Sequence, residues 1–271
     1  MTRKAMMVSA VTLGNALCGL LGGVALMRVA AAPIEPSTRS IGLAAACIFA
    51  GFVLDRIDGT LARRFGVDSP FGAQLDSLCD VLSFGLLPAL LLIAPAPPSV
   101  TRLAIAMIYL ASAIARLSRF TLAATNAPGA DPMPRPIING DQHYHGLPSP
   151  AAAMVVASVV LLEAFGSYGA MFDLAVLAPP DLAGHGWFTI LLTIAAAIAM
   201  VQPWPYADPP RAFVSGRWPR LLLVALIAIG VVAGPFAAMS LFAVGYLATG
   251  PILSRRVDAM SQSQPALEKA S

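Results

Sequence analysis

The chain has 271 residues, of which 17 are Lys or Arg and 14 are Asp or Glu; 58% are hydrophobic and the mean hydropathy is +0.76. Charged residues make up 11% of the sequence, less than half of the roughly 25% usual in soluble domains. This composition excludes an ordinary water-soluble enzyme, a disordered chain and a disulfide scaffold, and it predicts an all-α integral membrane protein. The net charge of +3 is typical of basic residues kept at one membrane face and does not indicate nucleic-acid binding.

Eight apolar stretches are candidates for membrane-spanning helices, because a helix needs about 20 residues to cross the hydrocarbon. They cover residues 5–30, 41–63, 71–94, 100–124, 149–166, 187–201, 220–232 and 233–253. We expect a six-helix core over 1–206, two additional helices over 207–253 and a polar flexible tail over 254–271. The last two stretches are separated only by the helix-breaking pair Gly234-Pro235, so six spans remain an alternative to eight.

The basic residues predict the orientation of these spans. With the amino terminus in the cytoplasm, all but three of the 17 basic residues fall at cytoplasmic ends or loops, the exceptions being Arg28, Arg39 and Arg102. The positive-inside rule therefore predicts that both termini are cytoplasmic. We also expect the protein to lie in the cell (inner) membrane.

The first predicted span carries polar and small residues in an otherwise apolar helix. Thr12 and Asn15 indicate either ligand contacts or hydrogen bonds between helices. Gly19 and Gly23, like Gly230 and Gly234, have the spacing that permits close helix packing, and a homodimer is one hypothesis that follows. The three cysteines also lie in apolar stretches and are predicted to be small buried residues: Cys18, Cys47 and Cys79.

Four of the 14 acidic residues lie inside the end of the second predicted span or the start of the third. Each pair is three or four residues apart and so shares one helix face: Asp55 with Asp58, and Asp76 with Asp80. In the linker, Ser69 is placed as a helix N-cap with a proline directly after it. A short turn there predicts two neighbouring helices whose carboxylates converge near the cytoplasmic surface.

Carboxylates at this density repel one another unless a cation compensates them, and hard oxygen ligands suit Mg²⁺, Mn²⁺ or Ca²⁺. Four acids favour two ions over one, as at many sites of phosphoryl chemistry. Gly59, Ala62 and Gly72 leave room beside the acids for a ligand or another helix. The nearby arginines could pair with the acids structurally or bind a phosphate-bearing substrate: Arg56, Arg63 and Arg64.

The residues from Asp55 to Asp80 follow the pattern Asp-x2-Asp-Gly-x2-Ala-Arg-x8-Gly-x3-Asp-x3-Asp at every position. This pattern resembles the signature of the CDP-alcohol phosphatidyltransferase family, membrane enzymes that move a phosphatidyl or related group from a CDP-linked donor to an alcohol and release CMP. The resemblance implies that the four aspartates hold two divalent cations, Mg²⁺ or Mn²⁺, and that Asp80 is also the general base. It implies donor contacts, to CDP-diacylglycerol, from Thr12, Asn15, Gly59, Arg63 and Ser69.

Further stretches resemble the phosphatidylserine synthases of this family, namely residues 12–19, 80–89, 115–120, 146–153 and 200–206. They imply L-serine as the acceptor and phosphatidylserine as the product, formed among membrane lipids. Thr121 departs from that subfamily, which has asparagine there. Arg116 and Arg119 could clamp a carboxylate or a phosphate, or reach lipid headgroups. Transfer to glycerol 3-phosphate or inositol phosphate, and a cation transporter with the aspartates as its ion site, remain alternatives.

A proline-rich loop contains Asp141, His143 and His145. Two histidines with this spacing can indicate a zinc site, but in such a loop they are more often solvated. We therefore predict solvated histidines here.

Overall fold

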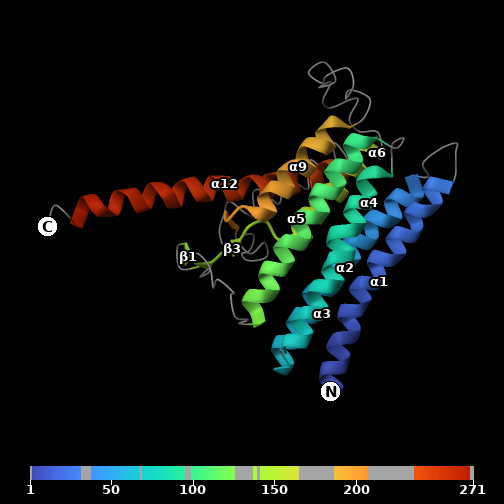
Figure 1. The fold of residues 1–271 in the computed structure, drawn as a ribbon, viewed down its shortest axis with the longest axis horizontal. Helices are drawn as coiled ribbons and strands as arrows, with labels where there is room; N and C mark the ends of the chain where they lie inside the picture. Colours follow the sequence, from blue (N-terminus) through green and yellow to red (C-terminus); the bar gives the residue numbers. More distant parts are fainter. Residues whose placement is uncertain are drawn as a thin grey trace.

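The computed structural model describes residues 2–31, 38–67, 69–94, 99–125, 137–138, 141–164, 186–206 and 235–268. Figure 1 shows a bundle of helices, with α12 crossing it and extending away at its carboxyl end. The helices are α1 (Arg3–Ala31), α2 (Thr38–Phe65), α3 (Pro70–Asp80), α4 (Leu87–Ile93), α5 (Val100–Thr125), α6 (Ser149–Ala164), α9 (Trp187–Val201) and α12 (Pro235–Glu268), with a π-helical turn η1 (Val81–Leu86) joining α3 to α4.

Short strands form two antiparallel pairs beside the bundle. Strand β1 (Ile137–Ile138) pairs with β2 (Asp141–Gln142), and β3 (Tyr144–His145) pairs with β4 (Pro205–Tyr206). Each strand has two residues, so the described part of the chain is almost entirely helical, as predicted.

Four helical stretches are long and apolar enough to cross a membrane: Arg3–Met27, Arg39–Phe65, Pro70–Ile93 and Val100–Leu122. Helices α6 and α9 are apolar but shorter. The prediction of an all-α membrane protein is therefore confirmed, whereas the count of eight spans and the cytoplasmic termini stay predictions. The seventh predicted span, residues 220–232, lies outside the described residues.

Helix α12 begins at Pro235, where the sequence predicts a helix boundary. It continues to Glu268, so the backbone is helical through most of the segment for which we expected a flexible tail. Its packed part anchors on β4, since the Tyr206 hydroxyl donates to the carbonyl oxygen of Leu247 over 3.0 Å.

The third span is irregular directly after Asp80. Pro88 has no N–H to donate, so the carbonyl of Phe84, four residues earlier, lacks its usual α-helical partner. The Tyr109 hydroxyl of α5 donates to this carbonyl over 2.9 Å. The π-helical turn η1 is thus tied to α5, and it lies immediately beyond the aspartates.

Helix α1 packs closely on this span through glycine. A Cβ added to Gly22 would lie 2.6 Å from a methyl of Leu87, and one on Gly19 would lie 3.0 Å from the Ser83 hydroxyl. Of the pair that suggested a homodimer, Gly19 is thus packed within the chain, and Gly23 is also buried there. The homodimer stays a prediction, and Gly230 and Gly234 lie outside the described residues.

Helix α6 lies at the centre of the apolar core, and most of its side chains are buried. Of the cysteines, Cys47 and Cys79 are buried and Cys18 is half-buried, all as free thiols, which agrees with the prediction. A partly buried ion pair joins α5 to α6, with 2.7 Å between Arg102 Nη2 and Glu163 Oε1. It lies near the start of α5, at the end of that helix opposite to Arg116.

Candidate active site

A cavity of about 560 Å³ opens between α1, α2, α3, α5 and α6. The first turns of α1 and α3 contribute to its lining, and Figure 1 shows that both helices begin at the same end of the bundle. The cavity brings together most of the predicted site residues, from four helices and the turn that precedes α3. Those that line it are Thr12, Asp55, Asp58, Gly59, Arg63, Ser69, Asp76, Asp80 and Arg116, but neither Asn15 nor Arg119 is among them.

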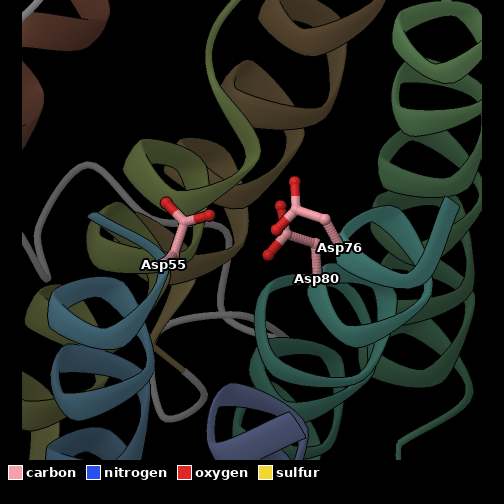
Figure 2. A group of neighbouring side chains, drawn as sticks. All are labelled: Asp55, Asp76 and Asp80. Atoms are coloured by element: carbon pink, nitrogen blue, oxygen red, sulfur yellow. The ribbon is translucent and has the colours of Figure 1, made fainter. Parts of the chain in front are cut away.

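Three of the four aspartates form one compact group. Figure 2 shows Asp76 and Asp80 of α3 pointing toward Asp55 of α2. One carboxylate oxygen from each lies within 4.8 Å of the others, so the group could hold a metal ion. Asp58 lies outside this group, is 4% exposed, and has the Thr12 side chain within hydrogen-bonding reach.

Two carboxylate oxygens at the site are buried without a hydrogen bond in the described part of the chain: Asp58 Oδ2 and Asp76 Oδ1. A buried carboxylate oxygen without a partner is costly, and a bound cation removes that cost. The donor set is entirely oxygen, which suits Mg²⁺ or Mn²⁺ better than softer metals. The residues present therefore fit divalent cations.

The local turn chemistry explains how α2 and α3 meet. Gly66 has φ +61°, a left-handed conformation that glycine adopts without strain. Ser69 then caps α3, and its Oγ accepts a hydrogen bond from the Gly72 N–H over 3.1 Å with Pro70 in the first turn. The predicted N-cap is confirmed, and the two aspartate pairs face each other because the turn is short.

The arginines of α2 lie at the edge of the cavity. A Cβ added to Gly59 would lie 3.4 Å from Nη1 of Arg63, so this glycine leaves room for the guanidinium itself. The Arg56 guanidinium lies over the Phe52 ring at 5.6 Å. Among the described residues, neither Arg63 nor Arg64 forms an ion pair with any of the four aspartates. The four carboxylates are therefore not neutralised by these two arginines.

The structure separates the two arginines of α5. Arg116 lines the cavity, donates from Nη1 to the Ser149 hydroxyl over 3.2 Å, and has a buried Nε with no hydrogen-bond partner in the described part of the chain. Arg119 is exposed and donates instead to the carbonyl oxygens of Ala115 and Val201. Of the two arginines predicted as a clamp, Arg116 lines the cavity with Ser149 beside it and Arg119 does not; their roles stay predictions.

Asn15 is fully buried, and its Nδ2 donates to Asp80 Oδ1 over 2.9 Å. Of the two interpretations left open by the sequence, a hydrogen bond between helices is therefore the one observed for this residue. Thr12 lines the cavity and donates to the Val8 carbonyl over 3.1 Å.

The prediction of solvated histidines is wrong for His143, which is 7% exposed and thus buried, while His145 is partly exposed. Pairing of β3 with β4 pins the loop to the end of α9, and Gly146 donates to the Trp204 carbonyl over 2.8 Å. Within the described residues, the potential metal-binding group contains aspartates alone. The same pairing places Tyr144 on the cavity wall, a position that only this long-range contact reveals.

Comparisons with known proteins agree with the geometry. Residues 6–179 match the family model described as CDP-alcohol phosphatidyltransferase. The chain is similar to the CDP-diacylglycerol–serine O-phosphatidyltransferases of Bacillus subtilis (32% identical over 128 residues, 46% of this chain and 67% of the relative) and Mycobacterium tuberculosis (25% over 215 residues, 78% and 68%). It is also similar to the enzyme of that name from Helicobacter pylori (33% over 118 residues), of which the match covers less than half, 45%.

The match to the family model covers more than half of the chain and includes all four aspartates, the capped turn between α2 and α3, and Arg116. The fold is helical and carries four helices suited to spanning a membrane. Sequence, site geometry and comparisons thus lead to one conclusion: the chain belongs to the CDP-alcohol phosphatidyltransferase family.

Proposed function

We propose that this protein transfers the phosphatidyl group of CDP-diacylglycerol to L-serine and forms phosphatidylserine and CMP. The names of the relatives support serine as the acceptor. Family membership supports phosphatidyl transfer from a CDP-alcohol and disfavours the alternative of a cation transporter.

The observation that carries the choice of serine is the setting of Arg116. On the α5 side of the cavity, among the described lining residues, it is the single cationic side chain, and the Ser149 hydroxyl and Tyr144 lie nearby. One guanidinium with a free buried Nε matches a carboxylate, which carries one negative charge. A phosphorylated acceptor brings up to two charges and favours a second cation, yet Arg119 is turned to backbone carbonyls.

The donor is proposed to lie on the α2 side, with its pyrophosphate near Arg63 and Gly59 and its nucleotide toward Thr12 and Ser69. Asp55, Asp58, Asp76 and Asp80 are proposed to hold two divalent cations, Mg²⁺ or Mn²⁺. When bound, these cations screen the negative charge of the pyrophosphate and of the leaving CMP. The buried, unpartnered oxygens of Asp58 and Asp76 support this ligand set.

In the proposed reaction, Asp80 removes the proton from the serine hydroxyl, and the serine oxygen bonds to the phosphorus that carries diacylglycerol. The bond from that phosphorus to the bridging oxygen of the pyrophosphate breaks, and the oxygen leaves with CMP. Arg116 binds the serine carboxylate and thereby orients the hydroxyl toward Asp80.

We place the reaction at the cytoplasmic face of the inner membrane. The cavity opens near the start of α1 and the end of α2, where basic residues gather at Arg3, Lys4, Arg63 and Arg64. Under the positive-inside rule this end of the bundle faces the cytoplasm. Serine is dissolved there, and the CDP headgroup of the lipid donor is accessible at that membrane surface.

The test is an acceptor panel. Purified protein is incubated with CDP-diacylglycerol and Mn²⁺, and L-serine, glycerol 3-phosphate, inositol phosphate or no acceptor is added. The proposal predicts a new lipid with serine alone. A lipid product from a phosphorylated acceptor, with none from serine, refutes the assignment of serine while leaving the transferase intact.

A further inference from the structure

Asn15 forms a hydrogen bond with the Asp80 carboxylate. Its amide Nδ2 donates to Asp80 Oδ1 over 2.9 Å, and no other hydrogen bond to this carboxylate is present among the described residues. The two residues are 65 positions apart and come from α1 and α3. The contact therefore depends on how the helices pack and not on local sequence.

The backbone of Asn15 is fixed by a second bond to the same span. The Ser83 hydroxyl, in the π-helical turn η1, donates to the Asn15 carbonyl oxygen over 2.7 Å. Asn15 thus accepts from the turn that follows Asp80 and donates to Asp80 itself. Both bonds are buried, so they fix α1 relative to the carboxylate.

Gly51 of α2 lies against the oxygen side of the Asn15 amide. A Cβ added to Gly51 would lie 2.7 Å from Asn15 Oδ1, while its next contacts, to Phe84 and Ser83, would be an ordinary 3.6 Å. A side chain at position 51 would therefore displace Asn15 before anything else. Gly51 does not line the cavity, so it can influence the reaction only through its neighbours.

The orientation of the amide follows from its partners. A carboxylate accepts hydrogen bonds, so the NH₂ group must face Asp80 and Oδ1 must face Gly51. Oδ1 is buried and has no hydrogen-bond partner within the described residues. An unpaired buried oxygen opposes folding, and a leucine of similar shape would avoid that cost, so stability alone does not account for asparagine here.

From these contacts we propose that Asn15 is a positioning residue for Asp80. Its amide engages Oδ1 of the Asp80 carboxylate and leaves Oδ2 of that carboxylate for the cavity. The inference rests on the proposed role of Asp80 as the base that deprotonates the acceptor. It departs from the donor contact that the family resemblance implies for Asn15, because Asn15 is absent from the cavity wall.

Three variants test this role. Asn15→Leu removes the donor at constant shape. Gly51→Ala displaces the Asn15 amide without altering its chemistry. Gly23→Ala is the matched control, because its added Cβ would meet only Leu90 at 3.8 Å, an ordinary contact. Steady-state kinetics with CDP-diacylglycerol, serine and Mn²⁺ are measured together with competition by CMP, which reports nucleotide binding directly.

For Asn15→Leu we expect kcat to fall about 10–100-fold, as is typical when the partner that orients a site ligand is lost. At saturating Mn²⁺, the KM for CDP-diacylglycerol and the inhibition constant of CMP should change less than about twofold, since Asn15 does not line the cavity and the metal sites stay filled. Gly51→Ala should lower kcat in the same way but to a smaller extent, and Gly23→Ala should match the wild type.

A raised KM and weakened CMP inhibition with an unchanged kcat in Asn15→Leu would overturn the proposal in favour of a nucleotide contact. Wild-type activity in Asn15→Leu, or in Gly51→Ala if the leucine variant does not fold, would overturn it as well. If the wild type uses an acceptor other than serine, the proposed function fails separately, and the same comparison of kcat with KM is made with that acceptor.

Discussion

Replacing Asp80 by asparagine separates its two proposed roles, base and metal ligand. The substitution keeps the shape of the side chain, and the asparagine oxygen can still accept the hydrogen bond from Asn15. It removes the negative charge and the proton acceptor. General bases contribute about 10²–10⁴-fold to rates, equivalent to roughly 3–5.5 kcal/mol of transition-state stabilisation. Asp80 also gives one of the three oxygens within 4.8 Å, so we expect a loss of about 10⁴-fold.

Asp76→Asn is the matched comparison, because Asp76 lies one turn earlier on the same helix and belongs to the same group of three. It loses a ligand but no base. Release of CMP is followed while Mn²⁺ is raised from micromolar to millimolar concentrations. We expect high Mn²⁺ to recover part of the activity of Asp76→Asn and almost none of that of Asp80→Asn. Recovery of wild-type kcat by Asp80→Asn at saturating Mn²⁺ would refute its role as the base.

Three further predictions follow from other contacts. Arg116→Gln should raise the KM for serine by at least about tenfold with little change in that for the donor, whereas Arg119→Gln should have a much smaller effect; equal effects would contradict the separation of the two arginines. Glu163→Gln should lower the free energy of unfolding by about 1–3 kcal/mol, seen as a lower Tm with unchanged KM values, because it removes the negative charge that pairs with the buried Arg102 guanidinium, which keeps its hydrogen bond to the Leu92 carbonyl; an unchanged Tm would show that the charge of Glu163 contributes nothing. Gly22→Val should lower the Tm through overpacking worth about 1–3 kcal/mol, and a variant as stable as the wild type would show that α1 shifts freely.

Features set by short-range spacing could be predicted from the sequence. The two aspartates of each pair lie about one helical turn apart on the same helix, and the Ser69 side chain caps α3. Composition predicts the membrane helices equally well, because a long apolar stretch forms a helix in a membrane regardless of which helices pack against it. The all-α membrane class and the capped turn are therefore found as predicted, and three of the four aspartates expected to converge do so, with Asp58 outside the group.

What could not be predicted depends on contacts between residues distant in sequence. Arg119 is turned away because α9 offers it the Val201 carbonyl, 82 residues later. His143 is buried because β3 pairs with β4, and nothing in the loop itself signals that partner. Asn15 meets Asp80 only once α1 packs on α3. Periodicity reports which face of a helix is apolar, but not which helix covers it.

The most direct test of the account is a measurement of both products in one reaction. Wild-type protein is given CDP-diacylglycerol, labelled L-serine and Mn²⁺, and CMP and labelled lipid are quantified over time, with and without a chelator. The account predicts equal amounts of CMP and phosphatidylserine, formed only when serine and the divalent cation are both present. Release of CMP without labelled lipid, or formation of phosphatidylserine at an undiminished rate in the chelator, would contradict it.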